Sequence, residues 1–140
     1  MSRSTPIPAR RPAASPRVRG SATILLIDDD PAVCEALHRL LSLEGWHVVA
    51  ASGGEQALEQ LQAGEPSLLI TDLCMTKISG WDILFHEKLQ RPSLPIFVIT
   101  ALPRSATRDA DNFATEFFEK PIDPDALIAA VRHHLGAPPT

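Results

Sequence analysis

The hydrophobic pattern from Thr23 to Leu135 switches repeatedly between short apolar runs and longer stretches in which apolar residues recur every three or four positions. Short continuous runs are typical of strands that are covered on both faces, and the wider spacing is typical of amphipathic helices. Their alternation predicts βα units around a parallel sheet. The runs that we expect to form strands are residues 23–27, 46–50, 67–71, 95–100 and 115–119.

Capping residues predict where the first two helices begin. Asp30 followed by Pro31 is typical of an N-cap and a first helical turn, and Gly45 ends the apolar periodicity that follows. Ser52 and Glu55 have the spacing of a capping box, in which each side chain bonds the backbone N–H of the other residue. We therefore expect one helix that ends at Gly45 and a second that starts at Ser52.

The remaining connections are also expected to be helical. One helix should follow Gly80, and another should follow the pair Asp123-Pro124. Residues 103–114 hold few apolar side chains, so a helix there should be short or loosely held. Because crossovers between parallel strands are right-handed, five strands with five helical connections favour an α/β, doubly wound (βα)5 sheet with the flavodoxin-like strand order 2-1-3-4-5.

Length and charge limit the class of protein. The 140 residues suit one compact domain. Residues 1–20 contain five arginines, four prolines and no acidic residue, so we expect a disordered basic arm there, and residues 137–140 should form a short tail. Residues 21–140 carry eight basic and 17 acidic groups. This acidic balance argues against direct binding of nucleic acid by the folded part.

The sequence also indicates in which cellular compartment the protein should be found. Its first residues lack the apolar segment of a signal peptide, and a run of about 18 apolar residues, long enough to cross a membrane, is absent. The two cysteines, Cys34 and Cys74, do not suggest a disulfide framework. We therefore expect a cytoplasmic protein that does not contact membranes.

Polar side chains follow four of the predicted strands. Asp28 and Asp29 come after the first, Asp72 after the third, Thr100 ends the fourth and Lys120 follows the fifth. In doubly wound sheets ligands bind outside the carboxyl ends of the strands, so these side chains should share one crevice. Three carboxylates there would repel one another unless a cation lay among them. Oxygen-rich sites of this kind suit Mg²⁺.

With these residues the sequence resembles the receiver domain of two-component response regulators. The resemblance covers residues 23–135 and would make residues 21–136 the receiver domain. It rests on motifs that occur in the expected order, at the expected elements: Asp28-Asp29, Asp72 in the stretch TDLCM, Ile99-Thr100-Ala101 and Lys120-Pro121.

The resemblance implies a phosphorylation site that depends on Mg²⁺. Asp72 would accept a phosphoryl group from the phosphohistidine of a histidine kinase or a histidine phosphotransfer protein. Asp29 would bind Mg²⁺ directly and Asp28 through water, with the backbone carbonyl of Cys74 as a further ligand. Such a domain catalyses only its own phosphorylation and dephosphorylation, so it is not an enzyme in the usual sense.

The resemblance also implies how the signal would leave the site. Lys120 would pair with the phosphoryl group and Thr100 would donate its hydroxyl to it, while Phe117 occupies the position of the family's switch aromatic. The result would be altered contact with a downstream protein target in phosphorelay signal transduction, or a homodimer that forms on phosphorylation.

Two features depart from the usual family pattern. Thr76 stands where most receivers have proline, and the segment between Thr100 and Lys120 is shorter than usual, which affects the fourth helix. Only five residues follow Leu135. We therefore expect either a stand-alone receiver or one excised from a longer protein.

Two alternative functions compete with this interpretation. Asp28-x-Asp30 after an apolar strand also resembles the motif of haloacid-dehalogenase-like phosphatases, with Asp28 as nucleophile and Asp30 as general acid, although Pro31 and Ala32 do not fit that motif. The second alternative is a receiver-like docking module that works without phosphorylation. Against it, every residue that the phosphorylation chemistry requires is present.

Overall fold

The computed structural model describes residues 23–73, 86–87, 90–108, 110 and 114–138. Its strands form one sheet in the order β2-β1-β3-β4-β5, and all neighbouring strands run parallel. This confirms the predicted doubly wound arrangement. The strands are β1 (Thr23–Ile27), β2 (His47–Ala51), β3 (Leu68–Asp72), β4 (Ile96–Thr100) and β5 (Glu116–Glu119).

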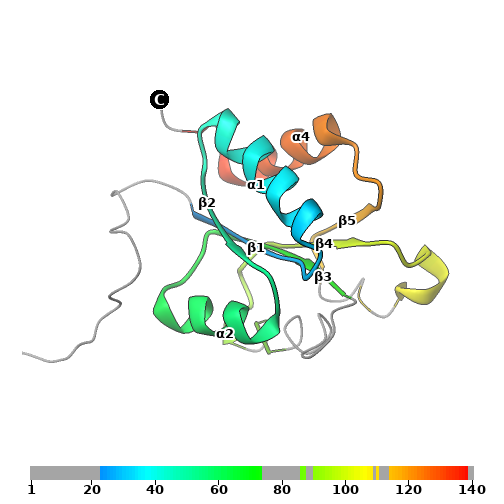
Figure 1. Ribbon diagram of the computed structural model, residues 1–140, viewed down its shortest axis with the longest axis horizontal. Coiled ribbons are helices and arrows are strands. Elements are labelled where there is room, and N and C mark those ends of the chain that lie inside the picture. Colours follow the sequence, from blue (N-terminus) through cyan, green and yellow to red (C-terminus); the bar gives the residue numbers. More distant parts are fainter. Residues whose placement is uncertain (1–22, 74–85, 88–89, 109, 111–113, 139–140) are drawn as a thin grey trace, which may run out of the picture.

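Helices cover both faces of the sheet. In Figure 1, α1 and α4 lie together on one face and α2 lies on the other. The helices in the described ranges are α1 (Pro31–Glu44), α2 (Gly54–Ala63) and α4 (Pro124–Leu135), with a 3₁₀ turn, η1 (Arg104–Ala106). None of the described helices is long and apolar enough to cross a membrane.

The alternation of side chains along the strands produces two separate cores. Ile24 and Leu26 of β1 pack with residues of α1 and α4, whereas Leu25 and Ile27 pack with residues of α2. β1, β3 and β4 are buried along their whole length. Their continuous apolar runs therefore reflect burial on both faces, as expected for the inner strands of such a sheet.

The two caps of α1 match the prediction. Asp30 accepts a hydrogen bond from the backbone N–H of Ala32, and Pro31 occupies the first turn. At the other end Gly45 has a φ of 113°, and its N–H bonds the carbonyls of Leu41 and Ser42. A left-handed residue in this place is typical of helix ends and favours glycine because it has no Cβ.

The predicted start of α2 was wrong by one residue. The N-cap is Gly53 rather than Ser52, and it makes no side-chain cap bond. The side-chain oxygen of Gln56, not that of Glu55, accepts hydrogen bonds from the Ser52 backbone N–H at 2.7 Å and from the Ser52 hydroxyl at 3.2 Å. Gln56 lies three positions after the actual cap, but it bonds Ser52, the residue before the cap, so the predicted capping box is absent.

The other predicted helices have mixed outcomes. α4 is confirmed, with Asp123 accepting from the N–H of Asp125. The described part of residues 103–114 contains the 3₁₀ turn η1 and further 3₁₀ residues instead of a regular α-helix, in keeping with the lack of an apolar stripe. The start of the helix after Gly80, the position Thr76 and the basic arm lie outside the described residues.

Replacing the N-cap residue of α1 should lower the stability of the protein, whether or not a ligand is bound. Asp30→Ala removes the acceptor for the Ala32 N–H, and we expect the free energy of unfolding to fall by about 1 kcal/mol. Asp30→Asn keeps a good capping oxygen and should change it far less. Urea unfolding of the three proteins measures this. Equal losses in both variants would mean that the charge of Asp30, not its capping bond, stabilises the helix.

Candidate functional site

The strand register brings the predicted site residues to one edge of the sheet. Ile27 of β1 pairs with Thr71 of β3. The next residues along the two strands, Asp28 and Asp72, therefore lie side by side at the strand ends. Asp72 pairs in turn with Ile99 of β4, one residue before Thr100. Because the strands are parallel, all their carboxyl ends meet on this side.

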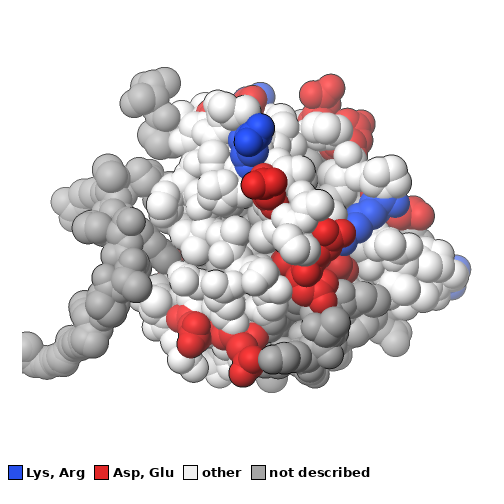
Figure 2. Space-filling view, viewed as in Figure 1, with Lys and Arg blue, Asp and Glu red and all other residues white. Residues whose placement is uncertain are grey.

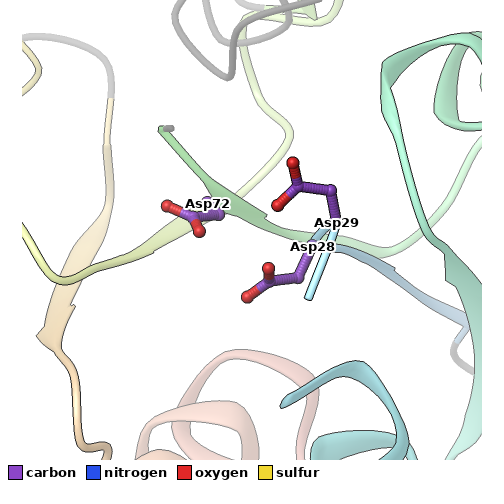
Figure 3. A group of neighbouring side chains, drawn as sticks. All are labelled: Asp28, Asp29 and Asp72. Carbon is purple, nitrogen blue, oxygen red and sulfur yellow. The ribbon is translucent and has the colours of Figure 1, made fainter. Parts of the chain in front are cut away.

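Three carboxylates gather at this edge. Asp28, Asp29 and Asp72 can each offer one oxygen such that all three oxygens lie within 4.8 Å of one another. Figure 3 shows Asp28 and Asp29 leaving the end of β1 and Asp72 leaving the end of β3 beside them. Asp28 is fully buried, Asp72 is 5% exposed and Asp29 is half-buried. Of the three carboxylates, that of Asp29 is therefore the most exposed to solvent.

Lys120 joins two of these carboxylates. Its Nζ lies 2.8 Å from Oδ2 of Asp28 and 2.9 Å from Oδ2 of Asp72. The Lys120 backbone N–H also donates to the carbonyl of Thr100 at 2.8 Å, which holds the residue against the end of β4. The lysine thus links the edge strand β5 to the central strands β1 and β3.

Burial and pairing shift two pKa values in this group. Burial raises the pKa of Asp28, although hydrogen bonds from Lys120 and from the Asp30 N–H oppose that rise. For Lys120, burial alone would lower the pKa, but hydrogen bonds to Asp28 and Asp72 and their negative charges outweigh it and raise the pKa. The lysine therefore stays charged throughout the physiological range.

Thr100 is the last residue of β4, and its hydroxyl oxygen accepts one hydrogen bond. The side chain is 2% exposed, and its Oγ1 accepts a hydrogen bond from the Leu102 N–H at 3.2 Å. A hydroxyl that accepts one bond still has a proton to donate. Thr100 is therefore a potential donor to an anionic group in the crevice, and its present bond ties it to the loop that leads to η1.

The two aromatic residues of β5 face opposite cores. Phe118 packs on the α1–α4 side, with its ring centroid 5.6 Å from that of Phe97. Phe117 is half-buried on the α2 side, in agreement with the alternation of a strand. Its predicted role as a switch stays a prediction. The remaining predicted site residue, Cys74, lies outside the described residues.

The carboxylate group fits Mg²⁺ in kind and in size. Mg²⁺ prefers oxygen ligands at about 2.1 Å, so ligands on opposite sides of the ion lie about 4.2 Å apart. The spread of 4.8 Å is slightly larger. It suits an ion that takes one or two carboxylates directly and reaches the other through water, as Mg²⁺ commonly does.

The sequence analysis did not find one ionic cluster, which is centred on the buried carboxylate of Glu87. Glu87 has a fully buried side chain that pairs with Arg91 and with Nδ1 of His86 at 2.7 Å. Arg91 also donates to the carbonyl of Leu61 at the end of α2, at 3.2 Å. The spacing of Glu87 and Arg91 by four residues was the available signal. Their position indicates a structural contact between α2 and the segment around Glu87.

Comparison with known proteins identifies similar sequences. The profile of the family described as response regulator receiver domain matches residues 24–132. The response regulator MprA of Mycobacterium ulcerans is 35% identical over 114 residues, which cover 80% of this chain and 49% of that protein. The chain thus spans about half the length of this relative.

Solved structures agree with the sequence matches. A response regulator from Chloroflexus aurantiacus superposes with a TM-score of 0.76 and 31% identity, covering 82% of this chain and 98% of the other. The response regulator TrrA of Thermotoga maritima, solved in complex with Mg²⁺ and BeF, has a TM-score of 0.74 and 28% identity, covering 80% and 97% of the two chains.

Removing the charge of Asp28 should stabilise the metal-free protein. Because burial raises the pKa of Asp28, the folded state binds this proton more tightly than the unfolded state. Binding of this proton therefore stabilises the folded state fully below the ordinary pKa of about 4. The stabilisation is lost as the pH rises through the raised pKa of the folded state. Asp28→Asn has no such loss, so its melting temperature in EDTA at pH 7 should exceed that of the wild type.

The control for this prediction is Asp125→Asn, which removes the same charge from an exposed position in the first turn of α4. It should leave the melting temperature unchanged or slightly lower. A lower melting temperature for Asp28→Asn than for the wild type would mean that attraction to Lys120 outweighs the effect of burial.

Proposed function

The chain belongs to the family of response regulator receiver domains, and from that membership we propose that Asp72 accepts a phosphoryl group from a phosphohistidine. The donor is a histidine kinase or a histidine phosphotransfer protein, which places the step in the cytoplasm. The product is an aspartyl phosphate whose charge alters contacts with a downstream protein.

One observation carries the proposal: a single ammonium group bridges the buried Asp28 and the more accessible Asp72. Lys120 Nζ is within 3 Å of both carboxylates, at 2.8 and 2.9 Å. The arrangement divides the carboxylates by role. Asp28 is fully buried and is held by Lys120 and by the Asp30 N–H, whereas Asp72 is 5% exposed and would be the carboxylate that meets the donor.

The transfer is a displacement at phosphorus. An Asp72 carboxylate oxygen forms the new bond to phosphorus, the bond between phosphorus and the imidazole nitrogen breaks, and that nitrogen keeps the electron pair. Catalysis of such a step consists mainly of alignment and of neutralising the equatorial oxygens. Bound Mg²⁺, held by Asp28, Asp29 and Asp72, would supply part of that neutralisation.

Lys120 and Thr100 supply the remaining contacts. The ammonium of Lys120 already lies beside Asp72 and can pair with a phosphoryl oxygen after transfer. Thr100 has a hydroxyl proton to donate, and its movement toward the phosphoryl group would break the bond from the Leu102 N–H. The loop before η1 would then shift, and Phe117 on the neighbouring strand would follow as the switch aromatic.

The output of the proposed switch is protein contact. Phosphorylation adds nearly two negative charges to the crevice, which biases the surface formed by β5, α4 and the residues around η1. The partner is a downstream protein or, in the form of a homodimer that assembles on phosphorylation, a second receiver. Family membership removes the phosphatase alternative, and Asp30 caps α1 where that alternative needs a general acid.

Replacement of the phosphoacceptor should abolish labelling. Incubated with Mg²⁺ and a small acyl phosphate, the wild type should gain the mass of one phosphoryl group in an adduct that is stable in acid and labile in base. Asp72→Asn should gain none, and the control Asp30→Asn should label normally. Intact-mass spectrometry reads all three. Absence of label in the wild type, also with a cognate kinase, would instead support a docking module that works without phosphorylation.

Two further variants should separate metal binding from signal transmission. Asp29→Asn should weaken Mg²⁺ binding by at least about tenfold, because it removes an anionic ligand. Lys120→Ala should bind Mg²⁺ at least as well as the wild type, because a positive charge leaves the site, but phosphorylation should no longer change the surface around β5. Calorimetric titration with Mg²⁺ and amide hydrogen exchange with and without phosphorylation measure the two effects.

The matched control for the lysine is Arg39→Ala, which removes an exposed cation far along α1 and should behave as the wild type in both measurements. Equal Mg²⁺ affinity in Asp29→Asn and the wild type would contradict the ligand assignment. A normal hydrogen-exchange response in phosphorylated Lys120→Ala would contradict the role given to the lysine.

A further inference from the structure

A hollow of about 340 Å³ lies where β3 and β4 begin. Its lining consists of the residues that directly precede these two strands, 65–67 and 90–95. Three prolines and Leu94 supply much of this lining, so the hollow is mainly apolar. Because Asp72 is the last residue of β3, the hollow lies at the other end of that strand from the proposed phosphorylation site.

Residues 1–22 join the fold beside this hollow. Thr23 begins β1, and its backbone N–H donates to Oγ of Ser67 at 3.4 Å, while the Ser67 N–H donates to the Thr23 carbonyl at 2.7 Å. Ser67 is itself part of the lining. Arg19 lies four positions before Thr23, and four extended residues span at most about 14 Å. The last residues of the basic arm are therefore within reach of the hollow.

A buried hydroxyl at this junction has no partner in the described part of the chain. Thr23 is 3% exposed, and its Oγ1 makes no hydrogen bond to any described residue. Alternation along β1 places Thr23 on the same side of the sheet as Leu25, whose core includes Leu94 of the hollow. A buried hydroxyl without a partner is costly. A backbone carbonyl of a chain segment that lies against this side would satisfy it.

The surface around the hollow is acidic. Glu65 lies at its border, with a side chain that is 60% exposed, and the positive charge of Arg91 is matched by Glu87. Residues 54–67, which comprise α2 and the loop to β3, contain three glutamates and no basic residue. Figure 2 shows acidic and no basic side chains over the part of α2 that faces the viewer. This side of the molecule should therefore attract a cationic segment.

The end of the basic arm has the composition that such a surface requires. Residues 16–19 read Pro-Arg-Val-Arg. In an extended chain successive side chains point to opposite sides. Pro16 and Val18 would then form an apolar side, and Arg17 and Arg19 a basic one. An apolar hollow with an acidic border complements both sides at once.

We propose that residues 16–19 of this chain dock in the hollow, with their apolar side against its prolines and their two arginines toward Glu65 and α2. The occupant is the chain's own arm because the arm joins the fold at the border of the hollow. A short flexible tether gives an effective concentration on the order of millimolar, so a weak contact is enough. Exposed ion pairs are individually weak and screened by salt, so docking is strongest at low salt.

Nuclear magnetic resonance of the full chain reports docking from both sides. At about 20 mM salt, the heteronuclear NOE of the Val18 amide should show restricted motion, compared with a synthetic peptide of the arm. Raising the salt to about 500 mM should bring Val18 to the value of the peptide and shift the amides of Ser67 and Ser93. A Val18 amide as mobile as the peptide at low salt overturns the proposal. Asp72→Asn should give the wild-type result, which separates this contact from the proposed phosphorylation chemistry.

Charge reversal tests the proposed pairing. Glu65→Lys and the double variant Arg17→Glu/Arg19→Glu should each lower the docked population about threefold or more. These side chains are exposed or lie in the arm, so the melting temperature should stay that of the wild type. Combining all three substitutions restores opposite charges, and this protein should dock better than Arg17→Glu/Arg19→Glu alone. No recovery in the combined variant overturns the pairing with Glu65.

Two matched controls test the position of the contact. Arg3→Glu/Arg10→Glu makes the same charge change farther from Thr23, and Glu35→Lys makes the same change as Glu65→Lys on α1, on the other face of the sheet. Both should leave docking within about twofold of the wild type. An equal loss in either control overturns the assignment to residues 16–19 and the hollow. Docking that disappears on dilution from about 1 mM to about 50 µM places the arm on a second copy and overturns the intramolecular contact.

Discussion

Three carboxylates that repel one another lie at a single edge of the sheet, and one lysine holds them together. Two ionised carboxylates about 5 Å apart repel by roughly 3 kcal/mol at the effective dielectric constant of a protein surface. Lys120 offsets part of this repulsion through its contacts with Asp28 and Asp72. It carries one positive charge against three negative ones, so a divalent cation would bring the group to neutrality. The chemistry proposed for the site follows from this imbalance.

The fold keeps these charges together because the aspartates stand at the ends of fully buried strands. β1 and β3 are buried along their whole length, so the aspartates at their ends have little freedom to move apart. Lys120 follows β5, at the edge of the sheet, and reaches the centre of the sheet over the end of β4. The ion pairs therefore connect the edge strand, which is only partly buried, to the core.

Sequence reasoning predicted those parts of the structure that depend on local pattern. The strands, their order, the caps of α1 and α4 and the convergence of Asp28, Asp72, Thr100 and Lys120 all follow from apolar periodicity and from general rules of sheet topology. It failed where distant residues decide. The convergence of Lys120 and Asp28 was predicted, but their direct ion pair across 92 positions was not, and the pairing partners of the buried Glu87 depend on how α2 packs. The one-residue shift of the α2 cap has a local origin, since two adjacent glycines, Gly53 and Gly54, permit either start.

Asp28 connects the site to the first turn of α1. One of its carboxylate oxygens accepts from Lys120, and the other accepts from the Asp30 N–H at 2.9 Å. Asp30 in turn caps α1. A carboxylate that binds Lys120 through one oxygen and the N-cap residue of α1 through the other should respond to a change of charge at the site. Such a response would reach α1 through its N-terminal cap, while Cys34, Leu37 and Leu41 hold the helix against the core.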